Sequence, residues 1–166
     1  YMLNTEHINL NSPIFWYLVG LVISDGHIDE KNKRIIINLT NDREILELLS
    51  DYYSTDVKIP VYRYSTNTEG KYKYSLTLSD ETLLNLFHFI GIVGYRKTYE
   101  VGFPDPQSKY LFNFLLRGFL DGDGNIRYHK QSMHMEFRFY TESHKLAEDI
   151  IKLCIKNVIT GWTGVA

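Results

Sequence analysis

Two aspartates stand at matching points of the sequence, each preceded by an apolar stretch and followed by a glycine. They are Asp25 and Asp123, 98 positions apart. Two carboxylates held side by side repel each other, and a hard divalent cation such as Mg²⁺ (or Mn²⁺) relieves that repulsion. Such a cation can activate water and stabilise a leaving oxygen. The pair therefore suits hydrolysis of a phosphodiester bond, provided that the fold brings both acids together.

The sequence around each aspartate is repeated. Segment 18–28 reads LVGLVISDGHI and segment 116–126 reads LRGFLDGDGNI, so leucine, glycine, aspartate, glycine and isoleucine recur in register. Gly20 and Gly118 lie inside the apolar stretches, where a glycine lets two helix backbones approach closely. We therefore expect two helices packed along their length, with the aspartates at adjoining ends.

The first repeat predicts the element order α-β-β-α-β-β-α. Pro13 suits the first turn of a helix capped by Ser12, and Asp25-Gly26 suits its end. The later elements follow from alternating β-branched and aromatic residues and from capping residues. In chain order they are a strand pair in His27–Thr40, a helix after Asp42, a strand pair within Val57–Leu78 and a helix over Glu81–Ile92.

The second strand pair of this repeat alternates between apolar and polar side chains. Its second arm places Tyr72, Tyr74, Leu76 and Leu78 on one face, with Lys71, Lys73, Ser75 and Thr77 on the other. Period-two alternation is typical of a strand with one buried side. We expect a sheet with one core face and one polar, cationic face.

The second repeat begins in the same way and is shorter. Alternating Met133, Met135, Phe137 and Phe139 predict a half-buried strand pair within Ile126–Tyr140, and Ser143 is expected to cap a helix. The remaining residues are too few for another strand pair and helix, so we expect this repeat to be incomplete. The predicted fold is α+β, a pseudo-twofold pair of repeats, with a tail (1–12), a first repeat (13–108) and a second repeat (109–166).

Positive charge is concentrated in the predicted strands. The net charge is −2, yet His27–Thr40, Val57–Leu78 and Ile126–Tyr140 carry ten basic and four acidic residues. Arginine and lysine contact phosphates and guanine edges in a major groove, and asparagine contacts adenine. The candidates for contact with duplex DNA are Lys31, Lys33, Arg34, Asn38, Arg63, Lys71, Lys73, Arg127, Lys130 and Arg138.

Together these motifs resemble the LAGLIDADG (dodecapeptide) homing endonuclease family. The resemblance covers Pro13 to about the end of the chain. It implies two α-β-β-α-β-β-α halves that meet at the motif helices, with their sheets in the major groove of duplex DNA. At the eighth motif position, Asp25 and Asp123 match the catalytic acids. At the third position, Gly20 and Gly118 match the helix-packing residues.

The resemblance also implies a site and leaves some positions unexplained. The expected metal site comprises Asp25 and Asp123 with the residues just before them, Ser24 and Gly122. Lys97 matches the region in which the family carries a basic residue that organises water or stabilises charge; a plain solvated lysine is the competing interpretation. The sequence departs from the motif at Ile23, where an aspartate is usual, and at Val19 and Arg117, where a small residue is usual.

The implied function is metal-dependent cleavage of both strands of a long, specific duplex DNA site by a monomer. The alternative is a non-cleaving nucleic-acid-binding protein of the same fold, either a transcription regulator or an intron RNA maturase, with intron RNA as a partner. The presence of both acids favours the enzyme. The longest apolar run, 14–23, is too short to span a bilayer, and Cys154 has no second cysteine to pair with. We expect an intracellular protein of the cytoplasm, nucleoid or organelle matrix.

Overall fold

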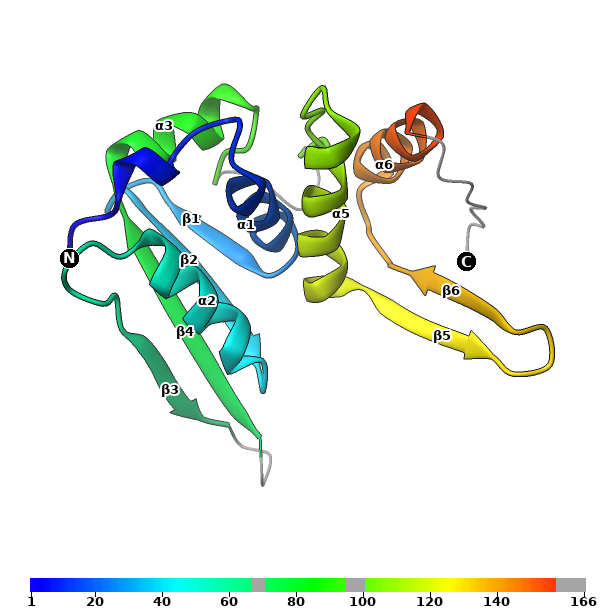
Figure 1. The fold of residues 1–166 in the computed structure, drawn as a ribbon, viewed down its shortest axis with the longest axis horizontal. Helices are drawn as coiled ribbons and strands as arrows, with labels where there is room; N and C mark the ends of the chain where they lie inside the picture. The colour runs from blue at the N-terminus through cyan, green and yellow to red at the C-terminus, as the bar shows by residue number, and fades with distance from the viewer. Residues whose placement is uncertain (67–70, 95–100, 158–166) are drawn as a thin grey trace.

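Two helices, α1 (Pro13–Ser24) and α5 (Lys109–Asp123), lie side by side in the centre of the molecule, with strands extending away on either side (Figure 1). The structure is a computed structural model, and it describes residues 1–66, 71–94 and 101–157. In the described part of the chain, no helix is long and apolar enough to cross a membrane.

Helix α1 begins where the sequence predicts. The Ser12 side chain accepts a hydrogen bond from Phe15 N at 3.2 Å, and Pro13 occupies the first turn, where its missing N–H costs nothing. Every residue from 15 to 23 is buried. A helix that is apolar on all sides must be covered on all sides. Here α5 covers one side, while the first sheet and its helices cover the others (Figure 1).

The first repeat forms a four-stranded antiparallel sheet with the strand order β1-β2-β4-β3. Its elements follow the predicted order α-β-β-α-β-β-α, which confirms that part of the fold. After α1 they are β1 (Gly26–Asp29), β2 (Arg34–Thr40), α2 (Arg43–Tyr53), β3 (Val61–Ser65), β4 (Tyr72–Ser79) and α3 (Glu81–Phe89).

Helix α3 ends earlier than the sequence predicts. It stops at Phe89 rather than Ile92 because Gly91 has a φ of 84°, a left-handed conformation that ends the helix. Two backbone bonds close this turn, from Ile92 N to Phe87 O and from Gly91 N to His88 O, both 2.9 Å. The apolar pattern continues to Ile92, which is buried, so the pattern alone extends the helix too far.

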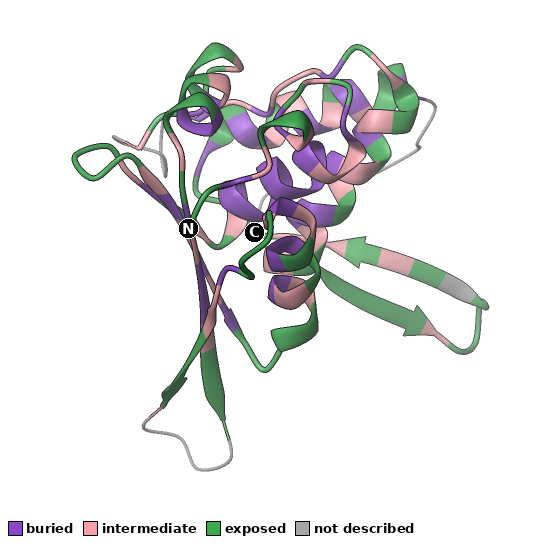
Figure 2. Ribbon diagram, turned by 60° about the vertical axis from the view of Figure 1, so that its left-hand side comes forward, coloured by how far each residue is buried: buried purple, intermediate pink, exposed green. Residues whose placement is uncertain are grey.

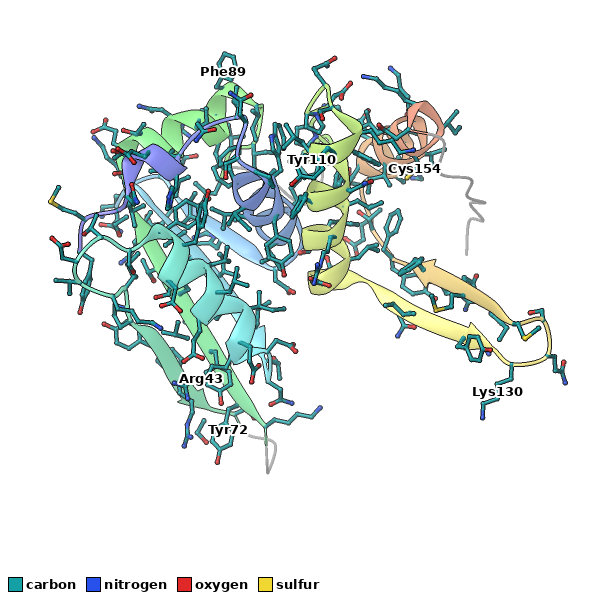
Figure 3. All side chains as sticks on the ribbon, in the orientation of Figure 1. Arg43, Tyr72, Phe89, Tyr110, Lys130 and Cys154 are labelled. Carbon is teal, nitrogen blue, oxygen red and sulfur yellow. The ribbon has the colours of Figure 1, made fainter. Side chains whose placement is uncertain are left out.

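The register of the sheet separates its two faces. Ile35, Ile37, Leu76 and Leu78 are buried on the face that α2 and α3 cover. The predicted alternation in β4 therefore holds at its inner end. At its outer end Tyr72 is 37% exposed, because the sheet extends past the covering helices (Figure 3). The opposite face is polar and includes Arg34, Asn38 and Lys73.

The N-terminal segment packs on this unit instead of forming a free tail. It contains a short 3-10 helix, η1 (Thr5–His7), and Leu3 and Ile8 are both buried. The His7 ring stacks on Tyr52 of α2, with 4.1 Å between ring centroids.

The second repeat is described as a two-stranded hairpin and one helix after α5. These are β5 (Asn125–His129), β6 (His134–Arg138) and α6 (His144–Lys156). The turns of the two motif hairpins match, since Lys33 and Met133 share left-handed φ values of 50° and 49°. The hairpin arms differ in length: residues 27–29 separate Gly26 from its turn, whereas residues 125–129 separate Gly124 from its turn. The extra pair of residues preserves which side chains share a face.

The half-buried face expected for this hairpin is instead exposed. Ile126 is 66% exposed and Phe137 is 55% exposed, and Met133 and Met135 are exposed too. Among the described residues, no further strands and no counterpart of α3 cover this face, and the hairpin projects from the body of the molecule (Figure 2). Only Phe139, beyond β6, packs inward as expected, against Phe119 with 5.3 Å between ring centroids.

Candidate active site at the paired motif helices

The two motif glycines lie where α1 and α5 cross. A Cβ atom built on Gly20 would overlap the backbone oxygen of Leu115, and one built on Gly118 would overlap the backbone oxygen of Tyr17. Each obstacle is main chain, which cannot rotate away. The structure therefore places both predicted helix-packing residues at a contact that only glycine permits.

Each motif helix passes directly into a strand at its Asp-Gly pair. Asp25 N donates to Leu21 O at 2.9 Å, and Gly124 N donates to Leu120 O at 2.8 Å. A Cβ on Gly26 would overlap the Cα of Val22, so the sharp turn that follows the aspartate needs a glycine. Both aspartates consequently lie at helix ends, and both are exposed to solvent.

The packing of α1 on α5 brings these two helix ends together. A Cβ built on Gly122 would lie 3.0 Å from Asp25 Oδ2 and would overlap Ser24 Oγ. The Asp25 carboxylate thus lies beside the residue that immediately precedes Asp123. Because Gly122 has no side chain, Ser24 and Asp25 lie against it, and Ser24 and Asp123 line one cavity, so the four residues of the expected metal site lie close together.

A cavity of about 200 Å³ opens next to Asp123. Ser24 lines it from α1, while Thr141 and Glu142 line it from the segment between β6 and α6. Glu142 therefore faces the same space as Asp123, although it is not among the site residues predicted from the sequence. The signal was available, because a strand that returns antiparallel to β5 must end close to the aspartate that precedes β5.

Arg117, the unusual motif residue of the second copy, takes part in a polar contact across the helix pair. Tyr17 Oη donates to Asp121 Oδ2 at 2.8 Å, and Arg117 Nε lies 3.6 Å from the same oxygen. Burial, together with this carboxylate, raises the pKa of Tyr17 far above its usual range. By the 98-residue offset, the residue that matches Tyr17 is Leu115 of α5 and the residue that matches Asp121 is Ile23 of α1, and both are buried. One side of the pseudo-twofold axis is polar and the other apolar.

The donor set is suited to Mg²⁺ or Mn²⁺. In the ranges that the structure describes, no group of three or more histidine, cysteine, aspartate or glutamate residues could hold a metal ion. Two carboxylates suffice for Mg²⁺, because this ion keeps several water molecules and takes substrate phosphate oxygens as further ligands. The cavity that Ser24 and Asp123 line leaves space for such an ion beside Asp123.

The candidate DNA-contacting residues of the first repeat fall into different places. Arg34, Asn38 and Lys73 share the polar face of the sheet, and Lys71 precedes β4 on the same side by alternation. Arg34 forms an ion pair with Asp29 at 2.9 Å. At the hairpin turn, Lys31 is exposed and Lys33 forms an ion pair with Glu81 at 2.7 Å.

Arg63 lies apart from this group. It is paired with Tyr74 in the register of β3 and β4, so it lies on the opposite face from Lys73. Its guanidinium stacks on the Tyr72 ring, 4.1 Å from the centroid. From the sequence alone, Arg63 and Lys73 were grouped as candidates for contact with DNA. The face on which a strand residue lies depends on the register of the strand, and a shift of one residue reverses that face.

The candidates of the second repeat lie on one hairpin. Arg127 and Arg138 share the polar face of β5 and β6, and Lys130 lies at the outer turn (Figure 3). Lys97 lies outside the described residues.

Comparison with known proteins found a likeness among solved structures. No family model matches the chain, and no curated protein matches it. A similar solved structure is the N-terminal LAGLIDADG domain of DUF199/WhiA, with a TM-score of 0.49 and 17% sequence identity over 93% of this chain and 67% of that chain. The candidate site therefore rests on the geometry of the paired helices.

Proposed function

We propose that this protein is a metal-dependent endonuclease that cleaves both strands of a long, specific duplex DNA site as a monomer. The observation that carries the proposal is the position of the Asp25 carboxylate, 3.0 Å from where a Cβ of Gly122 would be, directly beside Asp123. Two exposed aspartates thus lie at adjoining helix ends although they are 98 positions apart in the sequence.

In this proposal each aspartate serves one strand of the duplex. Asp25 and Asp123 would hold the ion or ions, with Ser24 and Gly122 shaping the space between them. Bound Mg²⁺ would supply an activated water molecule and stabilise the leaving oxygen. The pseudo-twofold relation of the helices matches the approximate twofold relation of the two strands across a groove, which supports cleavage of both strands. Lys97 remains our candidate for organising water or stabilising charge.

The sheets would provide the binding surface. By the 98-residue offset, His27 and Asp29 of β1 correspond to Asn125 and Arg127 of β5, so the polar faces of the two hairpins are related by the same pseudo-twofold axis as the acids. Both polar faces begin at the aspartates and extend outward. A duplex lying across them would have its midpoint at the acids.

The test separates binding from cutting. The whole chain is first allowed to select duplexes from a randomised library without Mg²⁺, and the retained duplexes are then incubated with Mg²⁺ while both strands are sequenced at their ends. We expect double-strand breaks at one place in the selected sequence. Asp25→Asn and Asp123→Asn should each bind the same duplexes and lose cleavage by at least about a hundredfold, since each removes a metal ligand.

Binding by the wild-type chain with no cleavage in Mg²⁺ or Mn²⁺ would refute the enzyme and support the non-cleaving alternative, a regulator or an intron RNA maturase. Asp105→Asn is a matched control, because Asp105 is an acid outside the site that pairs with Lys156 at 2.5 Å. It should cleave as the wild type does.

A further inference from the structure

The polar face of the second hairpin contains one acid among basic groups. Its side chains come from Asn125, Arg127 and His129 on β5, and from Glu136 and Arg138 on β6. An acid lowers the affinity of a surface for phosphate, so Glu136 is unexpected on a face that would contact DNA. Its contacts indicate a different role.

Glu136 holds Arg138 in place. Glu136 Oε2 accepts hydrogen bonds from Arg138 Nη2 at 2.7 Å and from His129 Nε2 at 2.9 Å. Arg127 lies directly opposite Glu136 in the strand register. The ion pair keeps the pKa of Glu136 near 2, chiefly through Arg138, so the carboxylate stays charged at neutral pH. Arg138 therefore projects from the sheet in a fixed orientation and not as a freely rotating chain.

The position of Arg138 places it close to the candidate active site. Arg138 pairs with Asn125, which is two residues after Asp123. Tyr140, two residues after Arg138, lines the same cavity as Asp123. Arg138 thus lies at the inner end of the hairpin, where the duplex would pass nearest to its scissile bonds.

A guanidinium held in this way suits base recognition better than phosphate binding. Guanine presents two acceptors, O6 and N7, to the major groove, and the planar guanidinium donates to both when its plane is fixed. A phosphate contact needs charge but little orientation. The Glu136 carboxylate fixes the plane of the Arg138 guanidinium and partly cancels its charge. It therefore favours base recognition over phosphate binding.

We infer that Arg138 reads a guanine next to the cleavage centre and that Glu136 is the positioning residue that sets specificity at this base pair. The inference rests on the proposed function, since it assumes that duplex DNA lies on this face. It assigns to Glu136 an effect on selectivity that is separate from affinity.

The test repeats the duplex selection without Mg²⁺, using the wild type, Glu136→Gln and Arg138→Lys. The wild type should enrich guanine at one base pair near the centre. Both variants should lower that preference by about tenfold or more at the same base pair and leave other positions unchanged. Glu136→Gln should bind bulk duplex at least as tightly as the wild type, because it removes a negative charge; a purely structural role would not produce that combination.

Glu47→Gln is the matched control, since it breaks the ion pair with Arg43 on α2, and neither residue is a candidate for DNA contact. It should leave every base preference intact. Unchanged preferences in Glu136→Gln and Arg138→Lys, or changes only at unrelated positions, would overturn the inference alone. A wild type that binds duplex without base preference would also contradict the specific site of the proposed function. A wild-type chain that retains no duplex at all would overturn the proposed function together with it.

Discussion

The two repeats share a motif and differ in how their strands are covered. In the first repeat, the apolar face of β1 and β2 is buried beneath α2 and α3. In the second, the corresponding face of β5 and β6 is exposed. Both hairpins nevertheless leave their motif helix through the same Asp-Gly turn. The comparison shows that the helix pair and its glycines place the acids, whereas the sheets need additional elements to be buried.

The helix crossing is the feature on which both repeats depend most. Gly118→Ala should destabilise the protein by about 3 kcal/mol or more, because the added methyl group would overlap the backbone of Tyr17. The free energy of unfolding in urea measures the effect. Gly91→Ala is the control: it adds a methyl group where nothing lies within 4 Å, at a φ of 84°, and should cost only about 1 kcal/mol. Equal losses would mean that the crossing tolerates a side chain.

The contrast between the sheets can be measured with one substitution in each. Ile37→Ala should cost about 3 kcal/mol, because Ile37 is fully buried in the first sheet. Phe137→Ala should cost less than about 1 kcal/mol, because more than half of its side chain already contacts solvent. Thermal or urea unfolding of the whole chain gives both values. A large loss in Phe137→Ala would show that the second hairpin is covered in solution.

The polar side of the helix pair predicts a smaller effect. Tyr17→Phe removes the hydrogen bond to Asp121 and should cost about 1 kcal/mol. A double-mutant cycle with Asp121→Asn isolates the contribution of the pair. Tyr64→Phe, which removes an exposed hydroxyl from β3, should be neutral. A Tyr17→Phe protein as stable as the wild type would leave the polar pair without a role in stability.

The smallest expected effect is the loss of stability in acid that comes from one lowered carboxyl pKa in each motif hairpin. Asp29 and Glu136 each have a pKa of about 2, the first mainly through hydrogen bonds from Asn32 and the second mainly through Arg138. Because these pKa values are lowered by folding, both contributions are present above about pH 4.5 and are lost as the pH falls toward 2.

Carboxyl titrations by NMR test this response. Arg138→Lys should raise the pKa of Glu136 and leave that of Asp29 unchanged. A wild-type Glu136 that titrates near 4.5 would contradict the ion pair seen here.

The sequence could predict the site because the relevant signal is local and occurs twice. An apolar helix with a central glycine and a terminal Asp-Gly leaves few ways to pack two copies, so the gathering of Asp25 and Asp123 could be anticipated. The position of Glu142 needs a second step, because it follows from the antiparallel return of β6 beside β5 and not from the motif itself.

The expectations for the β5–β6 hairpin and for Arg63 fail for related physical reasons. Alternation along a strand indicates which residues could be buried, but it does not indicate which elements cover them. Met135 and Phe137 alternate as regularly as Leu76 and Leu78, yet only the second pair lies beneath helices. Arg63 was assigned to the wrong group for a related reason, since its face depends on pairing with Tyr74 and not on its own sequence.

The unequal arms of the two motif hairpins make the two halves of the molecule reach different distances from the aspartates. Two extra residues lengthen each arm of the β5–β6 hairpin by about 7 Å, which is close to two base-pair steps of B-DNA. A duplex centred on the aspartates would be contacted farther from its midpoint on one side than on the other. Under the proposed function, such a protein would distinguish a sequence from its inverted copy and would not be restricted to palindromes.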